Sequence, residues 1–297
     1  MNMITIYKHY ILSNYLKSSK TFFIYQEYFS NNSLNHTYEP IEIPLKKNLV
    51  SKTEIIKLES FIDTFTRDST AMSIVVSNPY KTIAHKYCDL LSDNASNMKA
   101  VNLIVKRKGK LIGENIDGES FWLGQQHTKR VDYTKKTTLI LGCGGVSTSV
   151  AFKLVNMGAR TVFLYDTHHS KAIALADKLK RECLCSVVTP LKSLTQGIIF
   201  KASVIYNGTG VGKESSNLVS AYESPLPISM KANKDALAID ANYTPWETQF
   251  LRQCRSCGCD TLNGFSHMIA FTSMHLSKVL ETKVSYDSIY KIGKRYL

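Results

Sequence analysis

The segment 137–166 constrains the fold of this chain more than any other. It begins with Thr137–Leu141, a short apolar and β-branched run that is typical of a buried parallel strand. A glycine-rich turn, Gly142–Gly145, follows, and the apolar spacing then predicts a helix over 147–157. A second short strand ends at Asp166, which follows Gly142 by 24 residues. The segment therefore predicts a strand–turn–helix–strand unit with parallel strands.

This spacing is typical of a unit that binds a dinucleotide. Glycines let the backbone approach a pyrophosphate, whose charge is stabilised at the N-terminus of the helix. The acidic residue after the second strand can accept hydrogen bonds from the adenosine ribose. Ser147 stands where the pattern has its third small residue. The alternative is an ordinary turn without a nucleotide. The candidate cofactor-binding residues here are Gly142, Gly144, Gly145, Val146 and Asp166.

Composition narrows the class of protein. With 297 residues, 44% of them apolar and 21% charged, the chain can form two domains with real cores. It has no apolar run near the roughly 20 residues of a membrane span, and we expect no signal peptide and a cytoplasmic location. The net charge of +13 comes from scattered lysines and arginines. We therefore expect a field that attracts an anionic metabolite and cofactor, without specific nucleic-acid or membrane binding.

Seven cysteines raise the alternative of a metal site. Cys183 and Cys185 form one close pair, and Cys254, Cys257 and Cys259 form a second group. Zinc sites use such spacings, but no His or Cys cluster completes a paired ligand set. We favour free thiols in a reducing cytoplasm and expect no metal.

The remaining elements predict an α/β fold: a Rossmann-type domain over 124–264 and an α/β substrate-binding domain built from 1–123 and the C-terminal helices of 265–297. A glycine-rich loop, 208–212, follows a predicted strand and can pass close to a cofactor. The expected helices are 49–68, 82–91, from 120 onward, 170–180 and 266–280. The expected strands are 72–76, 101–105, 110–112, 185–188, 204–206 and 236–239.

Six short motifs in a fixed order indicate a family. They are SNPYK at 77–81, AVN at 100–102, GENIDG at 113–118, LGCGG at 141–145, NGTGVG at 207–212 and DANYTPWET at 240–248. With these, the chain resembles shikimate dehydrogenases and their quinate-using relatives over nearly its whole length. The resemblance implies NAD(P)-dependent interconversion of a ring hydroxyl of shikimate or quinate with its 3-dehydro ketone, in the biosynthesis of aromatic compounds. A monomer or homodimer is expected.

The resemblance also assigns roles to residues. It implies a catalytic pair, Lys81 and Asp117. A lysine beside a carboxylate can hydrogen-bond the hydroxyl oxygen and move its proton while the nicotinamide takes the hydride. The implied substrate-binding residues are Ser19, Thr21, Ser77, Asn102 and Tyr243. Further cofactor-binding positions are Asn207, Thr209 and Gly264.

The sequence departs from the family pattern at three places. Phe271 stands where the family has a substrate-binding Gln, and Gly210 replaces a proline. Asp166 replaces the Asn-Arg-Thr that meets the 2′-phosphate of NADP, so we expect NAD to be preferred over NADP. Two alternatives to a shikimate or quinate dehydrogenase remain open. One is a dehydrogenase of another hydroxylated ring acid, and the other is a non-catalytic ligand-binding relative.

Overall fold

The chain divides into two compact α/β units in a computed structural model. The residues described are 4–16, 20–45, 50–134, 136–182, 187–213 and 222–296. One unit consists of residues 1–116 and 269–297, and the other of residues 117–268. The predicted domain boundaries lie a few residues from this division and, as functional domains, stay a prediction. In the described ranges, no helix has the length and apolar content needed to cross a membrane.

The first unit has a six-stranded mixed sheet in the order β2-β1-β3-β5-β6-β4. β1 is parallel to β2 and β3, whereas β5 is antiparallel to β3 and β6. The strands are β1 (Tyr7–Ser13), β2 (His36–Glu42), β3 (Ala71–Val76), β4 (Leu90–Leu91), β5 (Leu103–Arg107) and β6 (Lys110–Glu114). The helices are α1 (Thr21–Asn31), α2 (Lys52–Arg67), α3 (Lys81–Ala84), α4 (Asp93–Met98), α10 (Phe265–Val279, whose start belongs to the second unit) and α11 (Tyr286–Gly293), with short 3₁₀ turns at His85–Tyr87 and Lys294–Tyr296.

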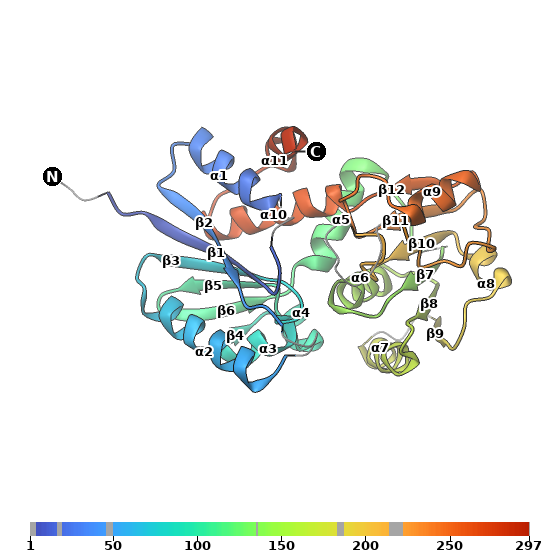
Figure 1. Ribbon diagram of the computed structural model, residues 1–297, viewed down its shortest axis with the longest axis horizontal. Helices are drawn as coiled ribbons and strands as arrows, with labels where there is room; N and C mark the ends of the chain where they lie inside the picture. Colours follow the sequence, from blue (N-terminus) through green and yellow to red (C-terminus); the bar gives the residue numbers. More distant parts are fainter. Residues whose placement is uncertain are drawn as a thin grey trace. The chain divides into compact units, whose positions relative to one another are not determined.

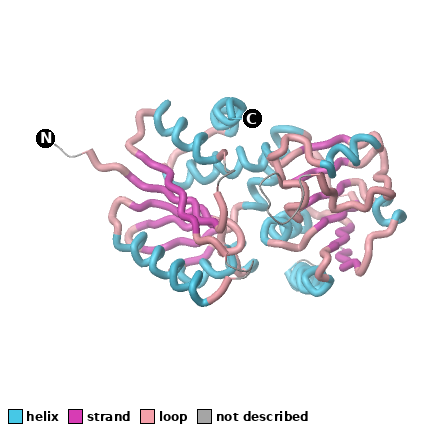
Figure 2. Tube along the Cα trace, in the orientation of Figure 1, coloured by secondary structure: helices cyan, strands magenta, loops and turns pink. Residues whose placement is uncertain are grey.

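The alternation of side chains along β1 separates the two faces of this sheet. Tyr10 and Leu12 point into an apolar core that α2 covers with Leu58, Ile62 and Phe65. His9 lies on the opposite face, where its ring is 5.5 Å from that of Phe29 of α1. Figures 1 and 2 show α1, α10 and α11 on one side of the sheet and α2 on the other. One face of the sheet is therefore apolar, and the other carries polar side chains into the interior.

The second unit has a six-stranded, fully parallel sheet in the order β12-β11-β10-β7-β8-β9. This is the doubly wound order of the classical dinucleotide fold, with β7 as its first strand. Its core contains Leu139, Leu141, Ile205 and Ala238. The strands are β7 (Thr137–Leu141), β8 (Thr161–Tyr165), β9 (Val187–Leu191), β10 (Val204–Asn207), β11 (Leu237–Asp240) and β12 (Asp260–Leu262). The helices are α5 (Asp117–Thr128), α6 (Gly145–Asn156), α7 (His169–Glu182), α8 (Gln196–Lys201) and α9 (Gln249–Ser256).

The α/β class, the Rossmann-type unit and the central β7–α6–β8 segment are confirmed, but several elements differ from the sequence prediction. The helix predicted over 82–91 is wrong, because α3 ends at Ala84 and β4 joins the sheet. The backbone N–H groups of Asp89 and Ser92 donate to β6 carbonyls (2.8 and 2.9 Å), which draws this segment to the sheet edge. α5 begins at Asp117 instead of 120 and ends at Thr128, within the first residues of the predicted Rossmann-type domain. Cys185 of the predicted strand 185–188 lies outside the described residues.

Candidate active site

The two glycine-rich loops of the second unit meet at the switch point of its sheet. β7 and β10 are neighbours, but the chain continues from β7 to β8 on one side and from β10 to β11 on the other. At such a point the loops diverge and leave a crevice at the carboxyl ends of the strands, where open α/β sheets bind ligands. Gly142 has a φ of +82°, and a Cβ there would lie 2.9 Å from the Thr209 side chain. The close approach of the two loops therefore depends on a glycine at this position.

The N-terminus of α6 faces open space. Gly144 is the N-cap of α6 and is exposed, and a Cβ there would meet no atom within 4 Å. The backbone N–H groups of Gly145 and Val146 belong to the first turn, where helices leave donors unpaired and favour negative charge. The structure thus brings Gly142, Gly144, Gly145 and Val146 together, as predicted, in an arrangement that fits a pyrophosphate.

Ser147 explains how tightly α6 packs on the neighbouring loop. Its side chain is fully buried, and its Oγ has no hydrogen-bond partner among the described residues. A Cβ added to Gly208 would lie 2.0 Å from this oxygen. A small residue at 147 and a glycine at 208 are therefore both needed to bring the two loops together.

Asp166 has a structural function in the glycine-rich turn. Its Oδ2 accepts a hydrogen bond from the Cys143 N–H (2.8 Å), and its Oδ1 accepts one from the His168 N–H (2.8 Å). The carboxylate thereby ties the glycine-rich turn to the end of β8. Each oxygen can still accept a second hydrogen bond, and the side chain is 12% exposed. Its interaction with a ribose stays a prediction.

A buried polar network supports the loop after β10. Asn207 Oδ1 accepts hydrogen bonds from the N–H and the hydroxyl of Thr209 (3.0 and 2.7 Å). Asn207 Nδ2 donates to Asp240 Oδ2 (3.1 Å), which also accepts from the Thr248 hydroxyl (2.6 Å). The N–H of Asn242 donates to Asp240 Oδ1 (2.8 Å). Burial raises the pKa of Asp240 to about 6. Asn207 therefore holds the loop in place with its side chain.

Asp240 and Thr248 were not identified as site residues from the sequence. The available signal was an acidic residue at the end of a predicted strand, inside the motif at 240–248. The partner of Asp240 on β10 is Asn207, which lies 33 residues earlier in the chain. Only the pairing of β10 with β11 brings these two residues together. Both side chains are fully buried.

Gly264 and Gly210 are fixed by backbone geometry. The N–H of Gly264 donates to the Asn242 carbonyl (2.9 Å), and a Cβ at 264 would lie 2.1 Å from the Ala241 carbonyl oxygen. This close approach sets the start of α10 beside the segment that carries Tyr243, whose pKa burial raises to about 12. Gly210 has a φ of +78°, which proline cannot adopt. A proline at 210 would therefore require a different loop conformation.

In the first unit, Ser77, Lys81 and Asn102 gather at the end of β3. Lys81 begins α3 and is 7% exposed, and its carbonyl accepts the Val101 N–H (2.9 Å). Asn102 is buried, and its Oδ1 accepts the Ile116 N–H (3.0 Å). Ser77 links to the end of β1, because its N–H donates to the Leu12 carbonyl (2.8 Å). These predicted residues therefore lie on adjoining backbone segments of this unit.

The remaining positions of the predicted site belong to α5, α1 and α10. Asp117 is the first residue of α5 in the second unit and is 5% exposed. Its pairing with Lys81 stays a prediction. Thr21 begins α1 and is partly buried, whereas Ser19 lies outside the described residues. Phe271 is half-buried on α10, next to the fully buried Thr272.

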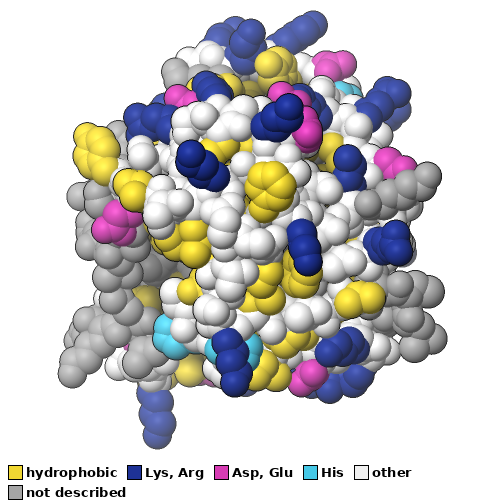
Figure 3. Space-filling view, turned by 90° about the vertical axis from the view of Figure 1, so that its right-hand side faces the viewer, with side chains coloured by type: hydrophobic (Ala, Val, Ile, Leu, Met, Phe, Trp, Pro, Cys, Tyr) yellow, Lys and Arg dark blue, Asp and Glu magenta, His cyan; other side chains and the backbone are white. Residues whose placement is uncertain are grey.

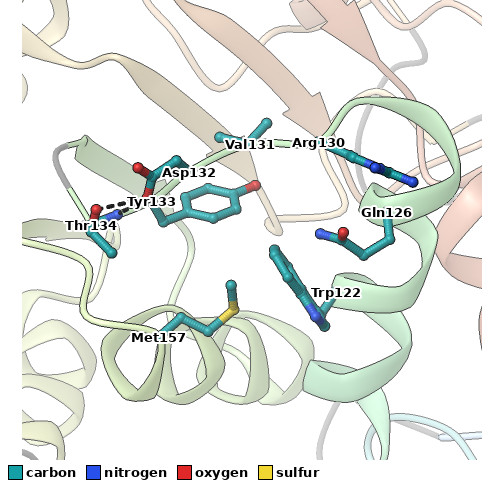
Figure 4. A pocket seen from close by; sticks show the side chains of 8 residues that line it. All are labelled: Trp122, Gln126, Arg130, Val131, Asp132, Tyr133, Thr134 and Met157. Carbon is teal, nitrogen blue, oxygen red and sulfur yellow. Dashed lines mark hydrogen bonds between the residues drawn. The ribbon is translucent and has the colours of Figure 1, made fainter.

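A shallow pocket lies at the opposite end of β7 from the glycine-rich turn (Figure 4). Trp122 and Gln126 of α5 face Tyr133 and Met157 across it. Met157 follows the C-terminal end of α6, whereas the turn that fits a pyrophosphate lies at its N-terminal end. This pocket is therefore separate from the crevice at the switch point. Its lining is Trp122, Gln126, Arg130, Val131, Asp132, Tyr133, Thr134 and Met157.

The strand order and the glycine-rich crevice define a two-domain α/β protein of the dinucleotide-binding class. Residues 11–104 match the family model described as the shikimate dehydrogenase substrate binding domain. A shikimate dehydrogenase (NADP(+)) from Streptococcus suis is 27% identical over 267 residues, which cover 87% of this chain and 86% of that relative. The predicted resemblance to the shikimate dehydrogenase family is therefore confirmed.

Two solved structures share the fold of the whole chain. One is a shikimate 5-dehydrogenase from Listeria monocytogenes in complex with shikimate and NAD, with a TM-score of 0.80 at 22% identity, covering 97% of this chain and 96% of that one. The other is a quinate dehydrogenase from Corynebacterium glutamicum in complex with NAD, with a TM-score of 0.81 at 22% identity, covering 97% and 98%.

Proposed function

We propose that this chain is a dehydrogenase that interconverts a ring hydroxyl of shikimate or quinate with the corresponding 3-dehydro ketone. The observation that carries the proposal is the match of residues 11–104 to the shikimate dehydrogenase substrate binding domain. That segment contains the buried Lys81 and Asn102, and the same chain has a doubly wound parallel sheet of the order that binds dinucleotides at its switch point. A substrate-binding domain and a cofactor crevice in one chain are the two parts that hydride transfer requires.

In the proposed mechanism, the chain's residues hold the hydroxyl and move its proton. Lys81 donates a hydrogen bond to the reacting oxygen and shuttles its proton, and Asp117 orients the lysine. Ser77, Asn102 and Tyr243 orient the ring, and Ser19 and Thr21 bind the carboxylate. Burial of Lys81 keeps water away from the reacting oxygen. The bound nicotinamide accepts or supplies the hydride.

We further propose that NAD is preferred over NADP. The Asp166 carboxylate ends β8, where it would accept hydrogen bonds from the ribose hydroxyls of NAD and repel the 2′-phosphate of NADP. The S. suis relative is named for NADP(+), whereas the L. monocytogenes and C. glutamicum structures contain NAD. Cofactor choice is thus a property on which this chain is proposed to differ from its NADP-dependent relatives.

Phe271 supports keeping another hydroxylated ring acid as a second candidate substrate. A phenyl ring on α10 cannot donate the hydrogen bonds of the family's Gln. The preferred substrate would therefore lack the polar group that faces position 271, or would bind with that group directed away from Phe271.

The test is a turnover screen of shikimate, quinate and related hydroxylated ring acids with NAD and with NADP. Turnover of shikimate or quinate supports the proposal. Turnover of a different ring acid alone favours the second candidate. Binding of a ring acid without turnover by any cofactor would show a non-catalytic relative and overturn the proposal.

A further inference from the structure

Five buried polar side chains of the first unit form a continuous hydrogen-bonded chain. The Tyr25 hydroxyl contacts His275 Nδ1 (2.6 Å), and His275 Nε2 contacts Ser73 Oγ (2.8 Å). Ser73 Oγ contacts His9 Nδ1 (2.8 Å), and His9 Nε2 contacts His36 Nδ1 (2.8 Å). We call these five residues the polar chain. Four of them are at most 1% exposed, and His36 is partly buried.

The polar chain joins five elements that are distant in sequence. Tyr25 belongs to α1, His275 to α10, Ser73 to β3, His9 to β1 and His36 to β2. The Tyr25 hydroxyl also bonds Thr272 and Tyr38, and its ring stacks on that of Tyr38 at 3.9 Å. Burial lowers the pKa of His9, His36 and His275, which keeps the three rings neutral. Apolar side chains could fill this space equally well, but they would not require fixed partners. The hydrogen bonds of the polar chain therefore select one arrangement of the five elements.

The donor and acceptor directions of all the hydrogen bonds in the polar chain depend on one another. A neutral imidazole has one donor and one acceptor nitrogen, and Ser73 has one hydrogen to donate. If Ser73 donates to His275, all three histidines carry their proton on Nδ1. If Ser73 donates to His9, all three carry it on Nε2. A break at any bond leaves a buried donor or acceptor unpaired, so the five elements are held in one mutual register.

Three members lie four residues from Thr21 or Ser77, which are predicted to bind the substrate, or from Phe271, which stands where the family has a substrate-binding Gln. Tyr25 follows Thr21 by four residues on α1, and His275 follows Phe271 by four on α10, so each pair shares one helical face. Ser73 precedes Ser77 by four residues and lies on β3, which leads directly to Ser77. The elements that the polar chain joins are therefore the ones that present these positions.

We propose that the polar chain positions α1 and α10 on the sheet so that Thr21 and Ser77 contact the substrate and Phe271 lines its site. Tyr25, His275 and Ser73 are positioning residues in this proposal, which rests on the proposed function. Substituting a residue of the polar chain should weaken substrate binding. It should not move the reacting groups, so kcat should stay unchanged.

The test compares Tyr25→Phe and Ser73→Ala with Tyr28→Phe, which removes one hydroxyl from a buried tyrosine of α1 outside the polar chain. We expect the first two to raise KM for the ring acid about tenfold, equal to about 1.4 kcal/mol of binding. Their kcat and cofactor KM should stay within twofold of wild type, and Tyr28→Phe should change none of the three. An unchanged substrate KM in both chain variants would overturn the proposal, even if their Tm falls.

Hydrogen exchange keeps this test separate from that of the proposed function. The amides of Tyr25 and His275 donate to the carbonyls of Thr21 and Phe271 within their helices. Both amides should exchange about tenfold faster in Tyr25→Phe than in Tyr28→Phe. Equal exchange in the two variants would overturn the positioning role even if the wild-type protein turned over no ring acid. Nitrogen spectra of the wild-type histidines should show one shared tautomer in His9, His36 and His275, and mixed tautomers would also contradict the proposal.

Discussion

At the residue scale, the proposed mechanism depends most on Lys81. Lys81→Ala should lower kcat by about 10² to 10⁴, because it removes the group that moves the hydroxyl proton. Cofactor affinity should be unchanged, since the crevice belongs to the other unit. Lys86→Ala is the matched control, because Lys86 is an exposed lysine of the following 3₁₀ turn. A kcat near the wild-type value in Lys81→Ala would contradict the mechanism.

Asp166 allows the cofactor proposal to be tested at a single functional group. Asp166→Asn removes the charge but keeps a side-chain oxygen for one of the two backbone N–H groups that Asp166 binds. The ratio of kcat/KM for NAD to that for NADP should fall at least about tenfold, or about 1.4 kcal/mol, as the repulsion of the 2′-phosphate disappears.

The matched control for that variant is Asp132→Asn. Asp132 holds a similar turn through the N–H and hydroxyl of Thr134 (3.0 and 2.7 Å) but lies at the opposite end of β7. Its substitution should leave the cofactor ratio unchanged. If Asp166→Asn also leaves the ratio unchanged, the carboxylate only holds the turn and does not select the cofactor.

The positions of site residues could be predicted where their contacts lie within one short segment of the sequence. Gly142, Gly144 and Asp166 lie in one strand–turn–helix–strand segment, so spacing alone indicated their shared place. The bond between Asn207 and Asp240 depends on which strands are neighbours, and the contact between Tyr25 and His275 spans 250 residues. Neither follows from a local pattern.

At the scale of elements, the approach of α10 to the segment after β11 should be sensitive to one added methyl group. Gly264→Ala places a Cβ 2.1 Å from the Ala241 carbonyl oxygen, so two backbone segments must separate. The free energy of unfolding should fall by about 1–3 kcal/mol in urea denaturation. Gly197→Ala is the control, because a Cβ there meets no atom within 4 Å and should stabilise α8 by about 0.5–1 kcal/mol. Equal stability of the two variants would contradict this packing.

The elements that could be predicted have a clear period and length. β7, α6 and β8 follow from a short apolar run, a helical spacing and glycine boundaries. The segment 82–91 was predicted to be one helix, but pairing with β6 drew its end into the sheet. In β2, Pro40 interrupts a strand-like pattern, and the strand is possible because β2 lies at the sheet edge.

At the scale of the whole molecule, charge is spread widely. Figure 3 shows lysine and arginine side chains scattered over one face, without a single dense basic patch. With a net charge of +13, such a surface attracts small anions from a distance. The expectation of no specific nucleic-acid partner stays a prediction.

Buried ionisable groups also determine how the stability of the molecule depends on pH. Burial lowers the pKa of His275 to about 3 and lowers those of His9 and His36, whereas unfolded histidines titrate near 6.5. Below about pH 6.5 the unfolded chain therefore binds protons that the folded chain does not. Asp240 acts in the opposite direction, because burial raises its pKa to about 6, above the value of about 3.9 in the unfolded chain.

The free energy of unfolding should consequently fall as the pH decreases from 7 to 5. Each buried histidine contributes a slope of at most about 1.4 kcal/mol per pH unit, and Asp240 offsets one of them. Because three histidines oppose one carboxyl group, the net loss should be about 1–3 kcal/mol in urea denaturation at pH 7, 6 and 5. His275→Gln should make the slope shallower by about one proton, and the same substitution at the exposed His127 is the matched control. Stability that is constant or rises from pH 7 to 5 would show that these histidines are protonated in the folded state.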